Sequence, residues 1–170
     1  TDKDFLINKA ISLFNDGSLK KSIKEALKAK KRYPDEPFIY NLLGVLYAHI
    51  NAYEDSVKNY SKAIKLNPNY FEAINNVGVA YISWRKFSKA IESFDRAIEI
   101  NPSYAEAYNN KGNALKEKGE YELATESYEK SIYLNPNFID AISNLAIIYD
   151  VMGDFNKAQT YSNQAISLNP

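Results

Sequence analysis

The stretch Asn67-Pro68-Asn69-Tyr70 recurs in the sequence as Asn101-Pro102-Ser103-Tyr104 and as Asn135-Pro136-Asn137-Phe138, 34 residues later each time. The same spacing leads back to Pro34 and on to the final Asn169-Pro170. Proline disfavours helix at the residue before it, so each Asn-Pro pair is expected to end a helix at a fixed place. The chain is therefore predicted to consist of repeats with a period of 34 residues.

Each repeat has the pattern of two helices joined by a tight turn. In the third repeat, apolar residues recur at intervals of three and four from Ile74 to Tyr81 and again from Ala90 to Ile98. In the first, fourth and fifth repeats a short break that contains glycine, such as Lys118-Gly119-Glu120, separates the two apolar runs. The repeats are placed at 3–36, 37–70, 71–104, 105–138 and 139–170.

Residues at fixed positions within the repeat are small, which lets the helices approach closely. Position 8, counted from the first residue of each repeat, reads Ala10, Gly44, Gly78, Gly112 and Ala146. Positions 20 and 27 hold only alanine or serine. A single hairpin of this size cannot bury its apolar face, so the repeats are predicted to stack on one another in a single domain, 1–170.

The pattern resembles the tetratricopeptide repeat in its bacterial consensus form, and the stretch Ala105–Leu115 carries the resemblance most clearly. Departures lie in the terminal repeats, with Lys9 at position 7, Ala26 and Ser162 at position 24, and Gln159 at position 21. The resemblance implies an all-α, right-handed superhelical solenoid of five 34-residue helix-turn-helix repeats, with ten antiparallel helices.

Composition excludes several classes of partner. The 21 Lys and Arg residues balance the 21 Asp and Glu residues, whereas a nucleic-acid binder usually carries a basic excess. There is no cysteine, no apolar run long enough for a membrane span and no signal peptide, so we expect a cytoplasmic location and no membrane. Residues 1–34 nevertheless hold nine basic and four acidic residues. This basic excess is interpreted either as a solvated helix face or as a surface for an acidic partner or neighbouring domain.

No pattern of residues indicates catalysis. His49 is the single histidine, and neither a His-Glu-x-x-His motif nor a glycine-rich phosphate loop occurs. We therefore expect no enzyme activity, no catalytic residues, no metal site and no cofactor.

By analogy with the family, the first helices of the repeats line a concave groove that binds an extended peptide. Their inward face is expected at positions 2, 5 or 6, 9, and 12 or 13, which share one side of a helix. The predicted peptide-binding residues are Asn41, Val45, Ala48, Asn75, Asn76, Val79, Ile82, Asn109, Asn110, Asn113, Lys116 and Asn144.

Asparagine is frequent among these residues, and two interpretations of it stay open. Its amide carries a donor and an acceptor, so a ladder of asparagines can pair with peptide backbones of any sequence. Such a ladder is similar to that in the superhelix of protein O-linked N-acetylglucosamine transferases. In the alternative interpretation, the asparagines cap or bridge neighbouring repeats.

The charges near the predicted groove favour a neutral or basic ligand. Position 2 is acidic in four repeats, with Asp4, Glu72, Glu106 and Asp140, which also favours the helix N-terminal dipole. The lysine and arginine residues with which chaperone-binding family members grip acidic C-terminal tails are missing at positions 2 and 6.

Three functions are consistent with the sequence. The first is a protein-protein interaction scaffold that binds a peptide or partner protein in the groove. The second is a substrate-presenting region of a larger glycosyltransferase or sulfotransferase, because the stretch from Phe38 to Val45 resembles the openings of such bacterial proteins. The third is self-assembly into a homo-oligomer through exposed solenoid ends, since the last helix keeps apolar residues such as Ile166.

Overall fold

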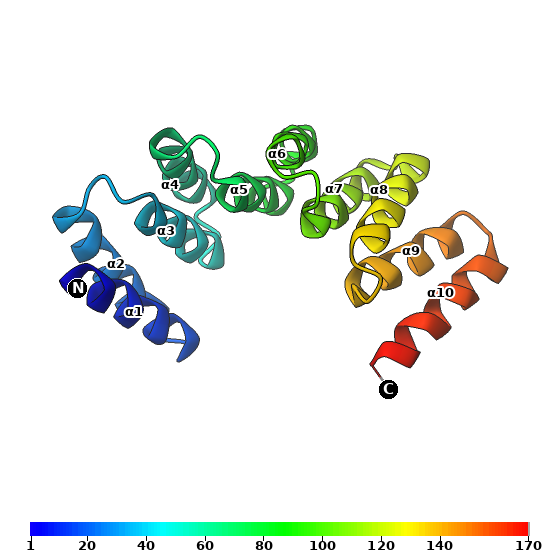
Figure 1. Cartoon of the computed structure of the whole chain (residues 1–170), viewed down its shortest axis with the longest axis horizontal. Helices are drawn as coiled ribbons and strands as arrows, with labels where there is room; N and C mark the ends of the chain where they lie inside the picture. Colours follow the sequence, from blue (N-terminus) through cyan, green and yellow to red (C-terminus); the bar gives the residue numbers. More distant parts are fainter. Residues whose placement is uncertain (170) are drawn as a thin grey trace. The chain divides into compact units, whose positions relative to one another are not determined.

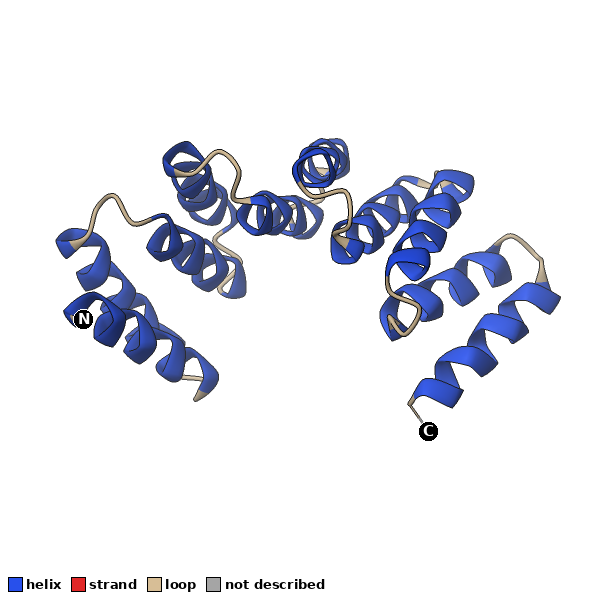
Figure 2. Cartoon of the chain, viewed as in Figure 1, coloured by secondary structure: helices blue, strands red, loops and turns tan. Residues whose placement is uncertain are grey.

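The computed structural model describes residues 1–169, and within that range it contains helices and no strand (Figure 2). Pro170, the last residue of the proline series, lies outside the described residues. The chain divides into two compact units, the first formed by Thr1–Arg85 and the second beginning at Lys86. Each unit is an array of antiparallel helices, which confirms the predicted all-α repeat solenoid.

The helices are labelled in Figure 1. The first unit contains α1 (Asp2–Asn15), α2 (Leu19–Arg32), α3 (Pro37–His49), α4 (Tyr53–Leu66) and α5 (Phe71–Ser83). The second unit contains α6 (Phe87–Ile100), α7 (Ala105–Lys118), α8 (Tyr121–Leu134), α9 (Ile139–Val151) and α10 (Phe155–Leu168). Within each unit every helix packs against the helix before it and the helix after it.

The helix boundaries repeat with the predicted period. All five second helices, the even-numbered ones, begin at position 17 of their repeat, and α3, α5, α7 and α9 all begin at position 1. The boundary between the two units falls in the turn of the third predicted repeat, between α5 and α6.

The Asn-Pro strings end helices through the asparagine side chain. Helices α4, α6 and α8 stop one residue before Asn67, Asn101 and Asn135. The Oδ1 atom of each asparagine accepts a hydrogen bond from the backbone N–H two residues later, at 3.2 Å, 3.2 Å and 3.3 Å. This is an Asx turn, which competes with helix, while the following proline cannot continue the helix. The predicted helix ends are therefore confirmed. The hydrogen bond of its side chain explains why asparagine precedes the proline in these repeats.

The turn inside each hairpin requires one residue in the left-handed conformation. That residue is always at position 15: Gly17, Asn51, Arg85, Gly119 and Gly153, with φ between 57° and 82°. Glycine adopts this conformation without steric cost, and asparagine tolerates it. The glycine turns are as predicted, but Asn51 and Arg85 show that the repeat imposes the same geometry on other residues.

The two helices of a hairpin approach most closely where position 8 faces position 24. A Cβ atom on Gly44 would lie 2.5 Å from Cε1 of Tyr60, and one on Gly112 would lie 2.6 Å from Cε1 of Tyr128. Both tyrosine rings are buried, so they cannot move away easily. In the first repeat, where position 8 is Ala10, position 24 is the small Ala26.

We predict that Gly112→Ala destabilises the second unit because the new methyl group overlaps Tyr128. The expected loss in the free energy of unfolding is about 1–3 kcal/mol, reduced by the roughly 1 kcal/mol that alanine gains over glycine in a helix. Urea denaturation measures the difference. The same substitution in a Tyr128→Ala background is expected to be neutral or stabilising, and an equal loss in both backgrounds would contradict the overlap.

Gly119 gives a second prediction, based on strain and not on contact. Its φ is +81°, and no atom lies within 4 Å of a Cβ built there. Gly119→Ala should lower the free energy of unfolding by about 1 kcal/mol. Gly119→Asn is the matched control and should cost less, because Asn51 adopts this conformation at the equivalent position. Unchanged thermal stability of the alanine variant would refute the argument.

Candidate functional site

The predicted binding residues lie on the first helices of the repeats. In the first unit α3 contacts α5 directly, and in the second unit α7 contacts α9. Within each unit, therefore, these faces lie side by side, and the structure brings together the predicted residues of neighbouring repeats.

Position 5 is not on the accessible surface in the middle repeats. Asn75 is 0% exposed and Asn109 is 5% exposed, whereas Asn41 is half-buried. Asn109 receives a hydrogen bond from the neighbouring first helix, so its side chain lies in the contact between repeats. A ligand that lies on the surface would not reach the Asn75 and Asn109 side chains in this arrangement.

Asparagine side chains bridge successive first helices within each unit. Asn76 Nδ2 donates to Asn41 Oδ1 at 3.1 Å, and Asn144 Nδ2 donates to Asn109 Oδ1 at 3.1 Å. Both bonds run from position 6 of one repeat to position 5 of the repeat before it. These four asparagine side chains therefore bridge neighbouring repeats, as the second interpretation of the asparagines expects.

The bridges leave hydrogen-bonding capacity on the half-buried partners. Among the described residues, the Oδ1 atoms of Asn76 and Asn144 accept no hydrogen bond. Asn113 is held differently, because its Oδ1 accepts a 2.8 Å hydrogen bond from the Tyr128 hydroxyl. Burial raises the pKa of Tyr128 well above its ordinary value, so the hydroxyl keeps the proton that it donates.

Apolar side chains occupy the accessible part of the same face. Val79 is 40% exposed, Ile147 at the same repeat position is 51% exposed, and Val45 is half-buried. Ala48, Ile82 and Lys116 at position 12, and Asn110 at position 6, are half-buried.

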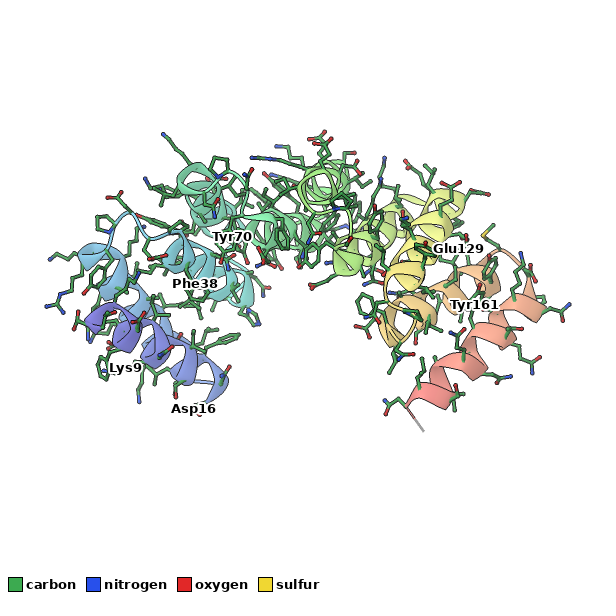
Figure 3. All side chains as sticks on the ribbon, viewed as in Figure 1. Lys9, Asp16, Phe38, Tyr70, Glu129 and Tyr161 are labelled. Atoms are coloured by element: carbon green, nitrogen blue, oxygen red, sulfur yellow. The ribbon has the colours of Figure 1, made fainter. Side chains whose placement is uncertain are left out.

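The structure adds residues that the predicted set omits. Ile147 shares position 9 with Val79 and was detectable from the repeat position alone. Phe38, labelled in Figure 3, is exposed at position 2, where most repeats have an acid. The Phe14 and His49 rings meet edge to face with their centroids 4.7 Å apart, a contact between repeats that sequence spacing does not reveal.

A depression in the second unit lies between α9 and α10 and includes part of the first-helix face of α9. It has a volume of about 770 Å³, and Ile147, Phe155 and Ile166 are among its lining residues. In earlier repeats the residues equivalent to Ile166, such as Ile64 and Ile132, are partly buried.

Across residues 1–169, no group of three or more His, Cys, Asp or Glu side chains is arranged to hold a metal ion. Within the same range no helix has the length and apolar character needed to cross a membrane.

Comparison with protein-family models identifies tetratricopeptide repeats along most of the chain. Two models described as tetratricopeptide repeat match residues 105–138 and 127–160. A third, described as TPR repeat, matches residues 46–83 and 86–118. Curated protein sequences give no match.

Solved structures with the same fold cover nearly the whole chain. MamA is 28% identical, with a TM-score of 0.80, over 94% of this chain and 93% of that one. PilF from Pseudomonas aeruginosa is 18% identical, with a TM-score of 0.89, over 99% of this chain and 77% of that one. PilW, described as a type IV pilus biogenesis factor, is 19% identical, with a TM-score of 0.90, over 99% and 78%.

The helical hairpins, their common period and the matched family models agree, and the chain belongs to the tetratricopeptide repeat family.

Proposed function

We propose that the chain is a protein-protein interaction scaffold that binds an extended peptide along the first helices of its repeats, and that it has no catalytic activity. The observation that carries the proposal is the exposure of Val79 in the first unit and of Ile147 in the second, each on first helices that also present asparagine amides of the same unit. Exposed apolar residues that recur at one repeat position form a surface that gains free energy when a partner covers it.

The polar groups on this face suit a peptide backbone. The Oδ1 atoms of Asn76 and Asn144 can accept hydrogen bonds from backbone N–H groups, and the Asn113 amide nitrogen can donate to carbonyls. The bridges and the Tyr128 hydroxyl hold these side chains in place, which lowers the entropy lost on binding. Peptide side chains would then lie against Val45 and Val79 in the first unit, or against Ile147 in the second unit.

Acidic residues at the start of the first helices favour a neutral or basic peptide. Asp4, Glu72, Glu106 and Asp140 are all exposed. Their charges would attract lysine or arginine residues that flank an apolar segment of the ligand, and salt would weaken that attraction.

A charge placed in the proposed surface tests the function. Peptides are first selected on the whole chain from a random-sequence library, and their affinities are measured by calorimetry. Val79→Asp should weaken binding at least about tenfold, because it places a carboxylate where an apolar side chain of the ligand would pack.

Leu123→Asp is the matched control. Leu123 is also an exposed aliphatic residue in the middle of the chain, at 49%, but it lies on the second helix α8. Its substitution should leave peptide affinity within about twofold of the original. Equal weakening by both variants, or full affinity in Val79→Asp, would remove the support for this surface.

The structural role of the asparagines gives a separate prediction. Asn144→Ala leaves Asn109 Oδ1 buried without its donor, so the free energy of unfolding should fall by about 1–3 kcal/mol. Asn163→Ala, at an exposed position on α10, should change it by less than about 0.5 kcal/mol. Urea denaturation compares the two, and equal stability would show that the bridge contributes nothing.

Self-association through α9 and α10 is a second candidate function. The 770 Å³ depression and the exposed Phe155 and Ile166 side chains favour it, because a helix of a second molecule can cover them. Light scattering over a concentration series tests it: Ile166→Asp should reduce association, and a strictly monomeric chain would exclude it.

A further inference from the structure

The outer face of α2 is strongly basic. The helix carries seven basic side chains and one acidic one. Lys20, Lys24, Lys28 and Lys31 recur at intervals of four, four and three residues and so share one side of the helix; we call them the basic stripe. All four are exposed, and with Ile23 and Leu27 they line a shallow depression of about 490 Å³.

Most of this charge is not neutralised within the first unit. Lys28 pairs with Glu25 at 2.7 Å. Among the described residues, Lys20, Lys24 and Lys31 form no ion pair. Leu27, in the middle of the stripe, is 41% exposed.

Two repeat positions that hold lysine in α2 hold glutamate in α8. Glu122, Glu126 and Glu129 occupy the positions that Lys20, Lys24 and Leu27 occupy in α2, and we call them the acidic stripe. All three are exposed; Glu129, labelled in Figure 3, accepts a 3.1 Å hydrogen bond from Tyr149.

Among the described residues, none of the three glutamates of the acidic stripe forms an ion pair. The one basic residue of α8, Lys130, has its ammonium 4.8 Å from the centre of the Tyr133 ring. Lys118, at the end of α7, pairs with Glu120, and Lys111 pairs with Asp95. Leu123 and Tyr133 are exposed beside the acids.

We propose that the basic stripe of one molecule binds the acidic stripe of a second copy of this chain. The two stripes have opposite charge at matching intervals along a helix, so several ion pairs form together when the helices lie against each other. Leu27 on one side, and Leu123 with Tyr133 on the other, supply apolar contact within the ring of charges. Each exposed ion pair contributes little, so the association is weak and depends strongly on salt.

A second copy fits the basic stripe better than an anionic membrane does. A membrane-surface helix needs a wide apolar face to insert between lipids. On α2 the small apolar residues Ala26 and Ala29 are fully buried in the repeat, and Leu27 is the single exposed large apolar residue of this helix. The complementary charges, by contrast, are present on the same chain.

Sedimentation velocity of the whole chain over a concentration series tests the proposal. Association is expected at about 0.01 M salt, where the Debye length is about 30 Å, and should be largely lost near 1 M, where it is about 3 Å. Lys20→Glu with Lys24→Glu should weaken association at least about tenfold at low salt, because two of the four lysines then become carboxylates that repel the acidic stripe. Glu122→Lys with Glu126→Lys should do the same.

Two controls isolate the pairing. Lys58→Glu with Lys65→Glu makes an equal charge change at exposed positions of α4 and should leave association unchanged. A one-to-one mixture of the α2 and α8 variants should associate again, since each basic stripe then meets an acidic one. All variants should keep the circular dichroism of the original chain because the altered side chains lie on the helix surface.

The remaining outcomes would overturn the proposal. A monomeric chain at low salt excludes it, as does a mixture of variants that stays monomeric. Association that persists at high salt and responds to Ile166→Asp but not to the charge changes would assign it to α9 and α10 instead. A monomer that binds vesicles of anionic lipid, and loses that binding with Lys20→Glu and Lys24→Glu, would assign the basic stripe to a membrane.

Discussion

Much of this structure depends on one contact inside the hairpin, between the backbone at position 8 of the first helix and the aromatic ring at position 24 of the second helix. At Gly44 and Gly112 the absence of a Cβ atom lets Tyr60 and Tyr128 pack against the helix backbone. The helices can therefore lie close together, and the small residues at positions 20 and 27 continue that close packing. The same contact serves the proposed binding surface, because the Tyr128 hydroxyl emerges beside Asn113 and orients its amide.

Several of these features can be predicted from the sequence because they repeat. The Asn-Pro strings predict where second helices end, and the glycines of the turns predict a left-handed residue, both of which the structure confirms. The pairing of glycine at position 8 with an aromatic residue at position 24, and of Ala10 with Ala26, is also visible in the aligned repeats. In physical terms, these features depend on local backbone conformation or on contacts within one hairpin.

Features that depend on the contact between hairpins were harder to predict. Helical spacing tells which residues share a side of a helix but not how deeply the neighbouring repeat covers them, so Asn75 and Asn109 were grouped with accessible residues although both are buried. One residue further along, at position 6, the side chains of Asn76 and Asn144 remain partly accessible. Arg85 was not predicted as a turn residue because its side chain gives no indication of a left-handed conformation. The outer faces of the second helices are the least constrained, and there lysine in α2 and glutamate in α8 occupy equivalent positions.

The local character of the packing has a consequence for folding kinetics. Within each unit the main contacts join helices that are adjacent or next but one in the chain, so no large loop must close before a hairpin gains its stabilising contacts. Chains with such low contact order fold on the microsecond to millisecond timescale. Each hairpin is stabilised only by the hairpins next to it in the chain. Local unfolding of one hairpin therefore need not involve the whole array.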